Sequence, residues 1–275
     1  MQKFFFLCFF ILNVSCSSLF FYPDKRQYIN PNLLTFKREE VFFYSNDGIK
    51  LHGWFFPSKE DKGTIIFLHG NAENIGTHIN SALWFINEGY NVFVFDYRGY
   101  GKSEGRPTIL GVHIDAESAI KFILSKEGIS KNLIIFGQSI GGAIAITTVA
   151  NSQYKETIKA MIIESAFSGY RTIAKDKISV NWFTKILGYP LLFLINDDFS
   201  PAYFVEYLSP IPVLFLHGCN DKIVPCYHTK ILYEKAKEPK KILIKEKAKH
   251  INVTRYIDVQ KEILKFLSNI EGLKD

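Results

Sequence analysis

The sequence predicts an α/β fold, built on a mostly parallel sheet with helices on both faces. Two observations lead to this expectation: short, continuously apolar runs alternate with amphipathic stretches along most of the 275 residues, and a hairpin signal precedes them. Continuous apolar strands are typical of parallel sheets, because helices cover both faces of such sheets. With 47% hydrophobic residues, the chain can form one substantial α/β domain or two small ones.

The hairpin signal is Asn46-Asp47-Gly48, between the two β-rich runs of VFFYSNDGIKLHGWFF, and it predicts an antiparallel pair of strands. After this hairpin, apolar runs predict strands at 64–70, 91–97, 133–137, 160–165, 212–218 and 241–246. Amphipathic spacing predicts helices at 72–88, 111–127, 140–151, 226–237 and 253–270.

Residues 170–206 interrupt this alternation, since they lie between two strands and are too long for an ordinary loop. They include WFTKILGYPLLFLIN, an apolar stretch split by Gly188 and Pro190. Two interpretations stay open for this insertion. It could consist of helices packed on the core, or form a short helical cap over an active site, lined with acyl-binding side chains.

The N-terminus has the pattern of an export signal. Lys3 is followed by nine apolar residues, 4–12, and then by small and polar residues that end at Cys16. Nine helical residues span about 14 Å, too short for a bilayer core of about 30 Å. Asn13-Val14-Ser15-Cys16 resembles a bacterial lipobox, in which the cysteine receives a lipid, although Asn13 departs from the usual Leu or Val. An uncleaved anchor over 4–22 and soluble export are the alternatives.

These observations divide the chain into an export signal with its lipobox at 1–16, a tether at 17–38 and a folded domain at 39–275 with the cap insertion at about 170–206. We expect the protein to be exported and attached to the membrane surface by an N-terminal lipid or anchor, as a lipoprotein of the bacterial cell envelope.

Charge and cysteine content narrow the range of partners. The net charge is +6, but the lysines are scattered among glutamates and form no basic stripe, so nucleic acid is not an expected partner. No C-x-x-C spacing is present, and we expect neither a metal nor a cofactor. Cys219 and Cys226 would be the cysteines of the mature body beyond Cys16. They could pair in an oxidising compartment, but two free cysteines are the favoured expectation.

The candidate chemistry lies at the carboxyl ends of the predicted strands, where function gathers in an open parallel sheet. Ser139 lies in Gly137-Gln138-Ser139-Ile140-Gly141 between a strand and a helix, and this G-x-S-x-G pattern is typical of a nucleophile elbow. A plain helix N-cap is the alternative for Ser139. Asp221 and His250 follow later strands, and the chain order Ser, Asp, His is that of an α/β-hydrolase.

The chain resembles the α/β-hydrolase-fold serine hydrolases from about residue 40 to 270. The resemblance rests on His69-Gly70-Asn71-Ala72, 96–103, 137–142, 217–225 and His250. The HGNA version is similar to a branch that includes eukaryotic protein depalmitoylases and bacterial lipoproteins. The resemblance implies a serine esterase or thioesterase that acts through an acyl-enzyme on a small or lipid-like acyl substrate. A peptidase of the prolyl-oligopeptidase type and a non-catalytic binding protein on the same fold are the alternatives.

Each catalytic role has a candidate. We expect Ser139 to be the nucleophile, His250 the general base and Asp221 the residue that orients the histidine. The backbone N–H groups of Asn71 and Ile140 are expected to form the oxyanion hole.

Rivals exist for two of these roles. Asp197 and Asp198 compete with Asp221, although they lie in the insertion. The other histidines are expected to have structural positions: loops for His69 and His217, and strand or helix surfaces for His52, His78, His113 and His228.

Overall fold

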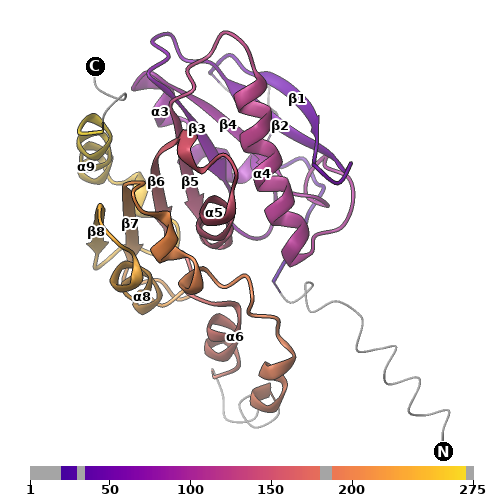
Figure 1. Ribbon diagram of the computed structural model, residues 1–275, viewed down its shortest axis with the longest axis vertical. Helices are drawn as coiled ribbons and strands as arrows, with labels where there is room; N and C mark the ends of the chain where they lie inside the picture. Colours follow the sequence, from indigo (N-terminus) through magenta and orange to yellow (C-terminus); the bar gives the residue numbers. More distant parts are fainter. Residues whose placement is uncertain (1–19, 30–34, 180–187, 271–275) are drawn as a thin grey trace, which may run out of the picture.

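An eight-stranded sheet runs through the computed structural model, which describes residues 20–29, 35–179 and 188–270 (Figure 1). The strands lie in the order β1-β2-β4-β3-β5-β6-β7-β8. Their bounds are β1 Glu39–Tyr44, β2 Lys50–Phe56, β3 Gly63–Leu68, β4 Tyr90–Asp96, β5 Leu133–Gln138, β6 Ile158–Glu164, β7 Val213–Gly218 and β8 Lys240–Lys245. β2 pairs antiparallel with β1 and β4, and the remaining pairings are parallel. The expected sheet with its antiparallel N-terminal hairpin is confirmed.

Helices cover both faces of the sheet. One face carries α4 (Ile109–Ser125), α5 (Ile140–Asn151) and α8 (Tyr227–Lys235), and the other carries α2 (Ile75–His78), α3 (Trp84–Asn87) and α9 (Ile257–Ser268). Neighbouring side chains of a strand point to opposite faces. In β3, for example, Ile66 belongs to one buried apolar cluster, whereas Ile65 and Phe67 belong to the other. This two-sided burial explains why central strands such as β3 and β5 are largely apolar.

The helix expected over 72–88 is broken into short pieces. Ala72 and Glu73 have positive φ angles of 62° and 54°, which exclude them from a right-handed helix. The helical backbone therefore begins after Asn74, whose side chain accepts a hydrogen bond from Gly76 N. A 3-10 turn, Ile79–Ser81, then separates α2 from α3. Apolar spacing predicted the buried face of this segment but not the turn inside it.

The insertion between β6 and β7 begins with α6 (Tyr170–Ile178) and continues with the 3-10 helices η5 (Tyr189–Leu194), η6 (Pro201–Tyr203) and η7 (Val205–Leu208). Figure 1 shows α6 and η5 projecting together from one end of the body. The guanidinium of Arg171 joins them, since it donates to the carbonyls of Leu192 at 3.1 Å and Ile195 at 3.0 Å. The apolar pairs at 182–183 and 186–187, which belong to the stretch expected to supply acyl-binding side chains, lie outside the described residues.

The segment 20–29, expected within a tether, packs on the body. Phe20 and Phe21 are buried, and the backbone N–H of Tyr22 donates to Asn71 Oδ1 at 3.0 Å. Asn74 Nδ2 donates to the carbonyls of Asp24 and Arg26, at 3.1 and 2.8 Å. The chain thus contacts the domain well before residue 39.

The export signal and Cys16 lie outside the described residues. Within 20–29, 35–179 and 188–270, no helix is long and apolar enough to cross a membrane.

Candidate active site

Ser139 lies at a sharp turn between β5 and α5. Its φ and ψ angles are 54° and −121°, a conformation that non-glycine residues rarely adopt. Its N–H donates to the carbonyl of Glu164 at 2.8 Å, and its side chain caps no backbone N–H of α5. A Cβ atom at Gly141 would collide with the carbonyl oxygens of Leu68 and His69, so only glycine fits there. This is the geometry of a nucleophile elbow and not that of a side-chain N-cap.

The fold brings Ser139, His250 and Asp221 together, although the first two are 111 positions apart in the chain. His250 Nε2 lies 3.0 Å from Ser139 Oγ, and His250 Nδ1 lies 2.6 Å from Asp221 Oδ2. Because the carboxylate can only accept, Nδ1 carries the ring proton and Nε2 is left to accept from the serine hydroxyl. The rival Asp197 instead accepts hydrogen bonds within the insertion, from Arg171 N and Tyr203 Oη.

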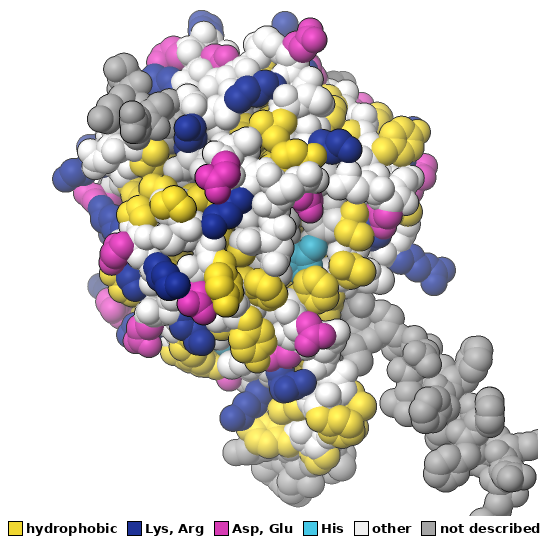
Figure 2. All heavy atoms as spheres, viewed as in Figure 1, with side chains coloured by type: hydrophobic (Ala, Val, Ile, Leu, Met, Phe, Trp, Pro, Cys, Tyr) yellow, Lys and Arg dark blue, Asp and Glu magenta, His cyan; other side chains and the backbone are white. Residues whose placement is uncertain are grey.

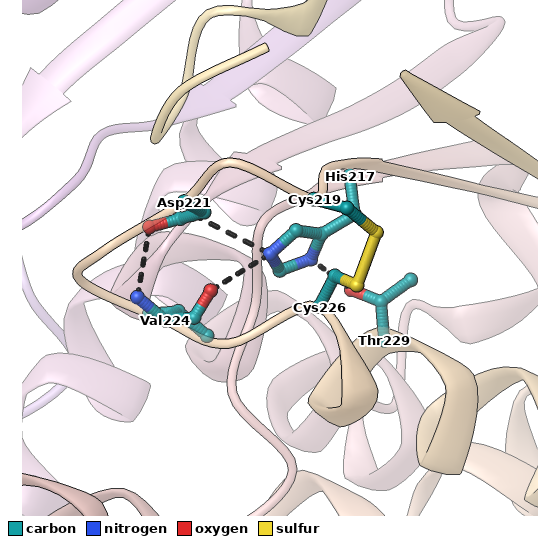
Figure 3. Close-up of a disulfide and its surroundings, with 6 residues drawn as sticks. All are labelled: His217, Cys219, Asp221, Val224, Cys226 and Thr229. Carbon is teal, nitrogen blue, oxygen red and sulfur yellow. Dashed lines mark hydrogen bonds and ion pairs between the residues drawn. A yellow bond between two sulfur atoms is a disulfide. The ribbon is translucent and has the colours of Figure 1, made fainter. Parts of the chain in front are cut away.

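Asp221 is held in a tight loop after β7. Its Oδ1 accepts from the backbone N–H groups of Ile223 and Val224, at 2.7 and 2.9 Å. His217 Nε2 lies 3.4 Å from Asp221 Oδ2 and 2.9 Å from the carbonyl of Val224 (Figure 3). Burial alone would raise the pKa of Asp221, but hydrogen bonds from His217 and His250 outweigh it and hold this pKa below the ordinary carboxyl range.

A disulfide between Cys219 and Cys226 closes the same loop (Figure 3). The expectation of two free cysteines is therefore wrong. The Cα atoms are 5.1 Å apart because the chain reverses direction between them, at the turn that Asp221 and Val224 form. Sequence spacing alone does not reveal this approach.

Ser139 opens into a pocket of about 360 Å³. The lining of this pocket is mostly apolar and comes from the N-terminal segment, the loops after β3 and β6, the elbow, α6 and the Asp221 loop: Phe20, Tyr22, Asn71, Ser139, Ile140, Phe167, Ile173, Ala174, Lys177, Ile178, Ile223 and Val224. Asn71 and Ile140, the expected oxyanion-hole residues, thus lie at the same pocket as the serine. The insertion covers the site through α6, whereas none of the residues 188–195 lines the pocket. Figure 2 shows hydrophobic side chains gathered on the lobe that α6 and η5 form.

Four histidines expected on strand or helix surfaces are buried: His52, His78, His113 and His228. Internal hydrogen-bond partners make this burial possible. His113 Nδ1 lies 2.8 Å from Thr148 Oγ1, and His228 Nε2 lies 2.8 Å from Asp176 Oδ2. Burial lowers the pKa of His113 to about 3, so its ring is neutral at physiological pH.

Sequence reasoning missed two contributors to the site. The first is the N-terminal segment, whose Phe20 and Tyr22 form part of the pocket wall. The second is Glu164, a fully buried acid at the end of β6. A signal for Glu164 was present, because an acid that ends a continuous apolar strand must find partners inside the protein.

The described residues contain no group of three or more His, Cys, Asp or Glu side chains arranged to hold a metal ion.

A mostly parallel sheet with a serine elbow, followed in chain order by an aspartate and a histidine, is the architecture of the α/β-hydrolase class. A family model described as "Serine aminopeptidase, S33" matches residues 59–195. The uncharacterized protein YfhR of Escherichia coli K12 is 35% identical over 263 residues, which cover 93% of this chain and 88% of that protein. The chain belongs to the α/β-hydrolase-fold serine hydrolases, and it is a hydrolase by this membership.

Two further proteins are similar. The Arabidopsis thaliana protein WAV2, described as α/β-hydrolase domain-containing, is 35% identical over 218 residues, 76% of this chain and 70% of that protein. The solved structure of the Pyrococcus furiosus esterase Pf2001 superposes with a TM-score of 0.74 at 20% identity, covering 91% of this chain and 97% of the esterase. This second likeness shows the shared fold.

Proposed function

We propose that the protein is a serine hydrolase that cleaves carboxylic esters or thioesters through an acyl-enzyme. One observation carries this proposal: Ser139 Oγ, at a mostly apolar pocket, is hydrogen-bonded at 3.0 Å to a histidine that is itself hydrogen-bonded at 2.6 Å to Asp221.

In the acylation step, Ser139 Oγ attacks the acyl carbon while His250 Nε2 takes the hydroxyl proton. The carbonyl oxygen becomes an oxyanion, and the backbone N–H groups of Asn71 and Ile140 donate hydrogen bonds to it. When the tetrahedral intermediate collapses, the bond to the alcohol or thiol breaks. His250 gives its proton to this leaving group, and the acyl group stays on Ser139.

In the deacylation step, water attacks the acyl carbon and His250 takes a proton from it. The bond to Ser139 Oγ then breaks, the proton returns to Oγ and the carboxylic acid leaves. Throughout both steps Asp221 keeps the ring proton on Nδ1 and stabilises the imidazolium that forms.

The pocket suits an acyl chain. Phe20, Phe167, Ile173 and Ile178 supply apolar walls, and each buried CH₂ of a substrate would contribute about 0.8 kcal/mol to binding. We therefore propose a lipid-like or other small acyl substrate.

A peptidase remains the second candidate, because the matching family model is described as a serine aminopeptidase. An aminopeptidase must bind the ammonium group of its substrate. Lys177 is the charged residue of the described pocket lining, and no Asp or Glu occurs there. A cation at this position disfavours an ammonium group, so the pocket supports the esterase assignment better.

We also propose that the protein is exported and attached to the cell envelope by a lipid on Cys16. Phe20 is four positions after Cys16 in the chain, which limits the distance between their Cα atoms to about 14 Å. Because Phe20 is part of the pocket wall, the lipid would hold the pocket close to the membrane surface, where acyl substrates occur.

An active-site fluorophosphonate probe tests the proposed function. The wild-type protein should be labelled and should hydrolyse acyl esters or thioesters, while Ser139→Ala should remain folded and lose both properties. A wild type that the probe leaves unlabelled would favour a binding protein on the same fold. Faster cleavage of aminoacyl amides than of matched esters would favour the peptidase.

A further inference from the structure

Four hydrogen bonds to the carboxylate of Glu164 connect the strand that leads to Ser139 with the turn that follows His250. Oε1 accepts from the backbone N–H groups of Val253 and Thr254, at 2.6 and 3.2 Å. Oε2 accepts from Thr254 Oγ1 at 3.0 Å and from Gln138 Nε2 at 2.6 Å. The side chain is fully buried, so these contacts replace water for a group whose burial would otherwise be costly.

The residues that Glu164 contacts lie close in the chain to Ser139 and to His250. Gln138 immediately precedes Ser139, and the carbonyl of Glu164 also accepts the N–H of Ser139 at 2.8 Å. Val253 and Thr254 lie three and four residues after His250 and form the turn that leads into α9. One residue at the end of β6 therefore contacts both the strand that delivers the serine and the turn that follows the histidine.

The backbone between His250 and this turn is strained. Ile251 has a φ angle of +45°, in the left-handed region, and this is a genuine outlier for a β-branched residue. Such a conformation persists only when the surrounding contacts determine it fully. Asn252 does not help through its Oδ1 atom, which is buried and has no hydrogen-bond partner in the part of the chain that the structure describes. The hydrogen bonds that the backbone N–H groups of Val253 and Thr254 donate to Glu164 fix the strained loop from its far end.

We propose that Glu164 is a positioning residue for His250: its carboxylate binds the turn after the histidine and thereby sets the distance between His250 Nε2 and Ser139 Oγ. This inference rests on the proposed function, because it assigns a role within the same site. Glu164 does not line the pocket, so it acts through His250 and makes no contact with substrate.

The first test is Glu164→Ala, which leaves four donors without their acceptor. The turn should relax and His250 should move away from Ser139. A misplacement of this kind lowers kcat by about 10- to 100-fold, whereas KM should change little because the pocket is intact. Active sites are counted by fluorophosphonate labelling carried to completion, and kcat is calculated per labelled site. Unfolded protein therefore does not lower the measured kcat.

Two conservative variants distinguish the effect of side-chain length at position 164 from the effect of its charge. Glu164→Gln keeps an oxygen for the N–H groups of Val253 and Thr254. Gln138 can turn its amide so that its Oε1, which has no partner among the described residues, accepts from the new Nε2. Glu164→Asp keeps the charge but is one CH₂ too short to reach the turn. We therefore expect kcat to decrease in the order wild type, Glu164→Gln, Glu164→Asp, Glu164→Ala. The comparison of Glu164→Gln with Glu164→Asp tests the proposal even if Glu164→Ala does not fold.

Asp115→Ala is the matched control. Asp115 is also fully buried, and Arg98 Nη2 and Nε donate to its Oδ1 at 2.7 and 3.0 Å. It lies in α4 and does not line the pocket. Its loss should lower stability and leave kcat per labelled site unchanged.

The inference is overturned if folded Glu164→Ala keeps the wild-type kcat, if Asp115→Ala lowers kcat per site equally, or if Asp supports a higher kcat than Gln. These outcomes differ from failure of the proposed function, which would appear as a wild type without labelling.

Discussion

The disulfide of Cys219 with Cys226 encloses Asp221, whose carboxylate lies 2.6 Å from the ring of His250. The bond therefore constrains the loop that carries the hydrogen-bond partner of His250. Asp221 also accepts two backbone hydrogen bonds inside this loop, from Ile223 and Val224. The disulfide and these hydrogen bonds thus constrain the same short segment.

Removal of this disulfide should lower both stability and activity. The cysteines are seven positions apart, and closing so short a loop stabilises a protein by about 2–3 kcal/mol in the chain-entropy model. We expect a Cys219→Ser/Cys226→Ser double variant to lose about this much free energy of unfolding in urea, and to lose kcat through a looser Asp221. A reducing agent should reproduce both effects in the wild type and leave the double variant unchanged. Equal unfolding free energies for oxidised wild type and variant would contradict this prediction.

The three residues of the proposed triad should act as a unit. Ser139→Ala and His250→Ala should each lower kcat/KM for an acetyl ester by several orders of magnitude, and Asp221→Asn should lower it by less or by a similar amount. Asp197→Asn is the matched control, because the hydrogen-bond partners of Asp197 among the described residues, Arg171, Ser200 and Tyr203, lie within the insertion. A larger loss in Asp197→Asn than in Asp221→Asn would reassign the acid.

The strands and the position of the proposed triad could be predicted from the sequence, because both depend on local patterns. Apolar runs mark the buried strands, and the end of each parallel strand falls at the same edge of the sheet. Ser139, Asp221 and His250 each follow such a strand, so the pattern alone places them near one another.

Other features depend on tertiary contacts that no local pattern encodes. The burial of His113 requires the facing Thr148 of α5, and the Cys219–Cys226 pairing requires the turn around Asp221. The prolines and mixed charges of 17–38 predicted a tether, yet Phe20 packs edge-on against Tyr170, with ring centroids 5.0 Å apart. A partner 150 residues away in the chain cannot be read from the segment itself.

Stability should decrease as the pH falls below about 6.5. Burial lowers the pKa values of His69 and His113 to about 3, whereas unfolded histidine titrates near 6.5. Between these values the unfolded state binds protons that the folded state does not, so the free energy of unfolding falls with decreasing pH. Each histidine contributes a slope of up to about 1.4 kcal/mol per pH unit.

His113→Asn isolates one of these contributions, since His113 lies in α4, away from the pocket. Urea unfolding at pH 7, 5.5 and 4.5 should show a shallower pH dependence for this variant than for the wild type. Parallel pH curves for the two proteins would show that His113 is protonated in the folded state.

Cys16→Ser tests the proposed lipid attachment. The variant should fail to mature and should release the body from the membrane fraction, because the lipid would be the anchor. Fractionation and intact-mass measurement of the full chain follow both effects. Unchanged membrane association together with an unchanged mass would instead indicate an uncleaved anchor over 4–22.

The last prediction concerns acyl length. If the apolar pocket binds the acyl chain, kcat/KM should rise with each added carbon, by up to about four-fold for 0.8 kcal/mol, until the pocket of about 360 Å³ is full, and should then level off or fall. Ile178→Asp should flatten this rise, because Ile178 of α6 lines the pocket and a carboxylate there must be desolvated when a chain binds. Acetyl-ester turnover should stay within a few fold, because an acetyl group offers little apolar chain for this wall to contact.

Leu191→Asp provides the control in the same insertion. Leu191 is 56% exposed in η5 and does not line the pocket, so its variant should keep the wild-type dependence on acyl length. The comparison uses one series of p-nitrophenyl esters from acetyl to dodecanoyl. If Ile178→Asp keeps the rise, or Leu191→Asp abolishes it as well, the acyl chain binds elsewhere, and α6 serves only to cover the body.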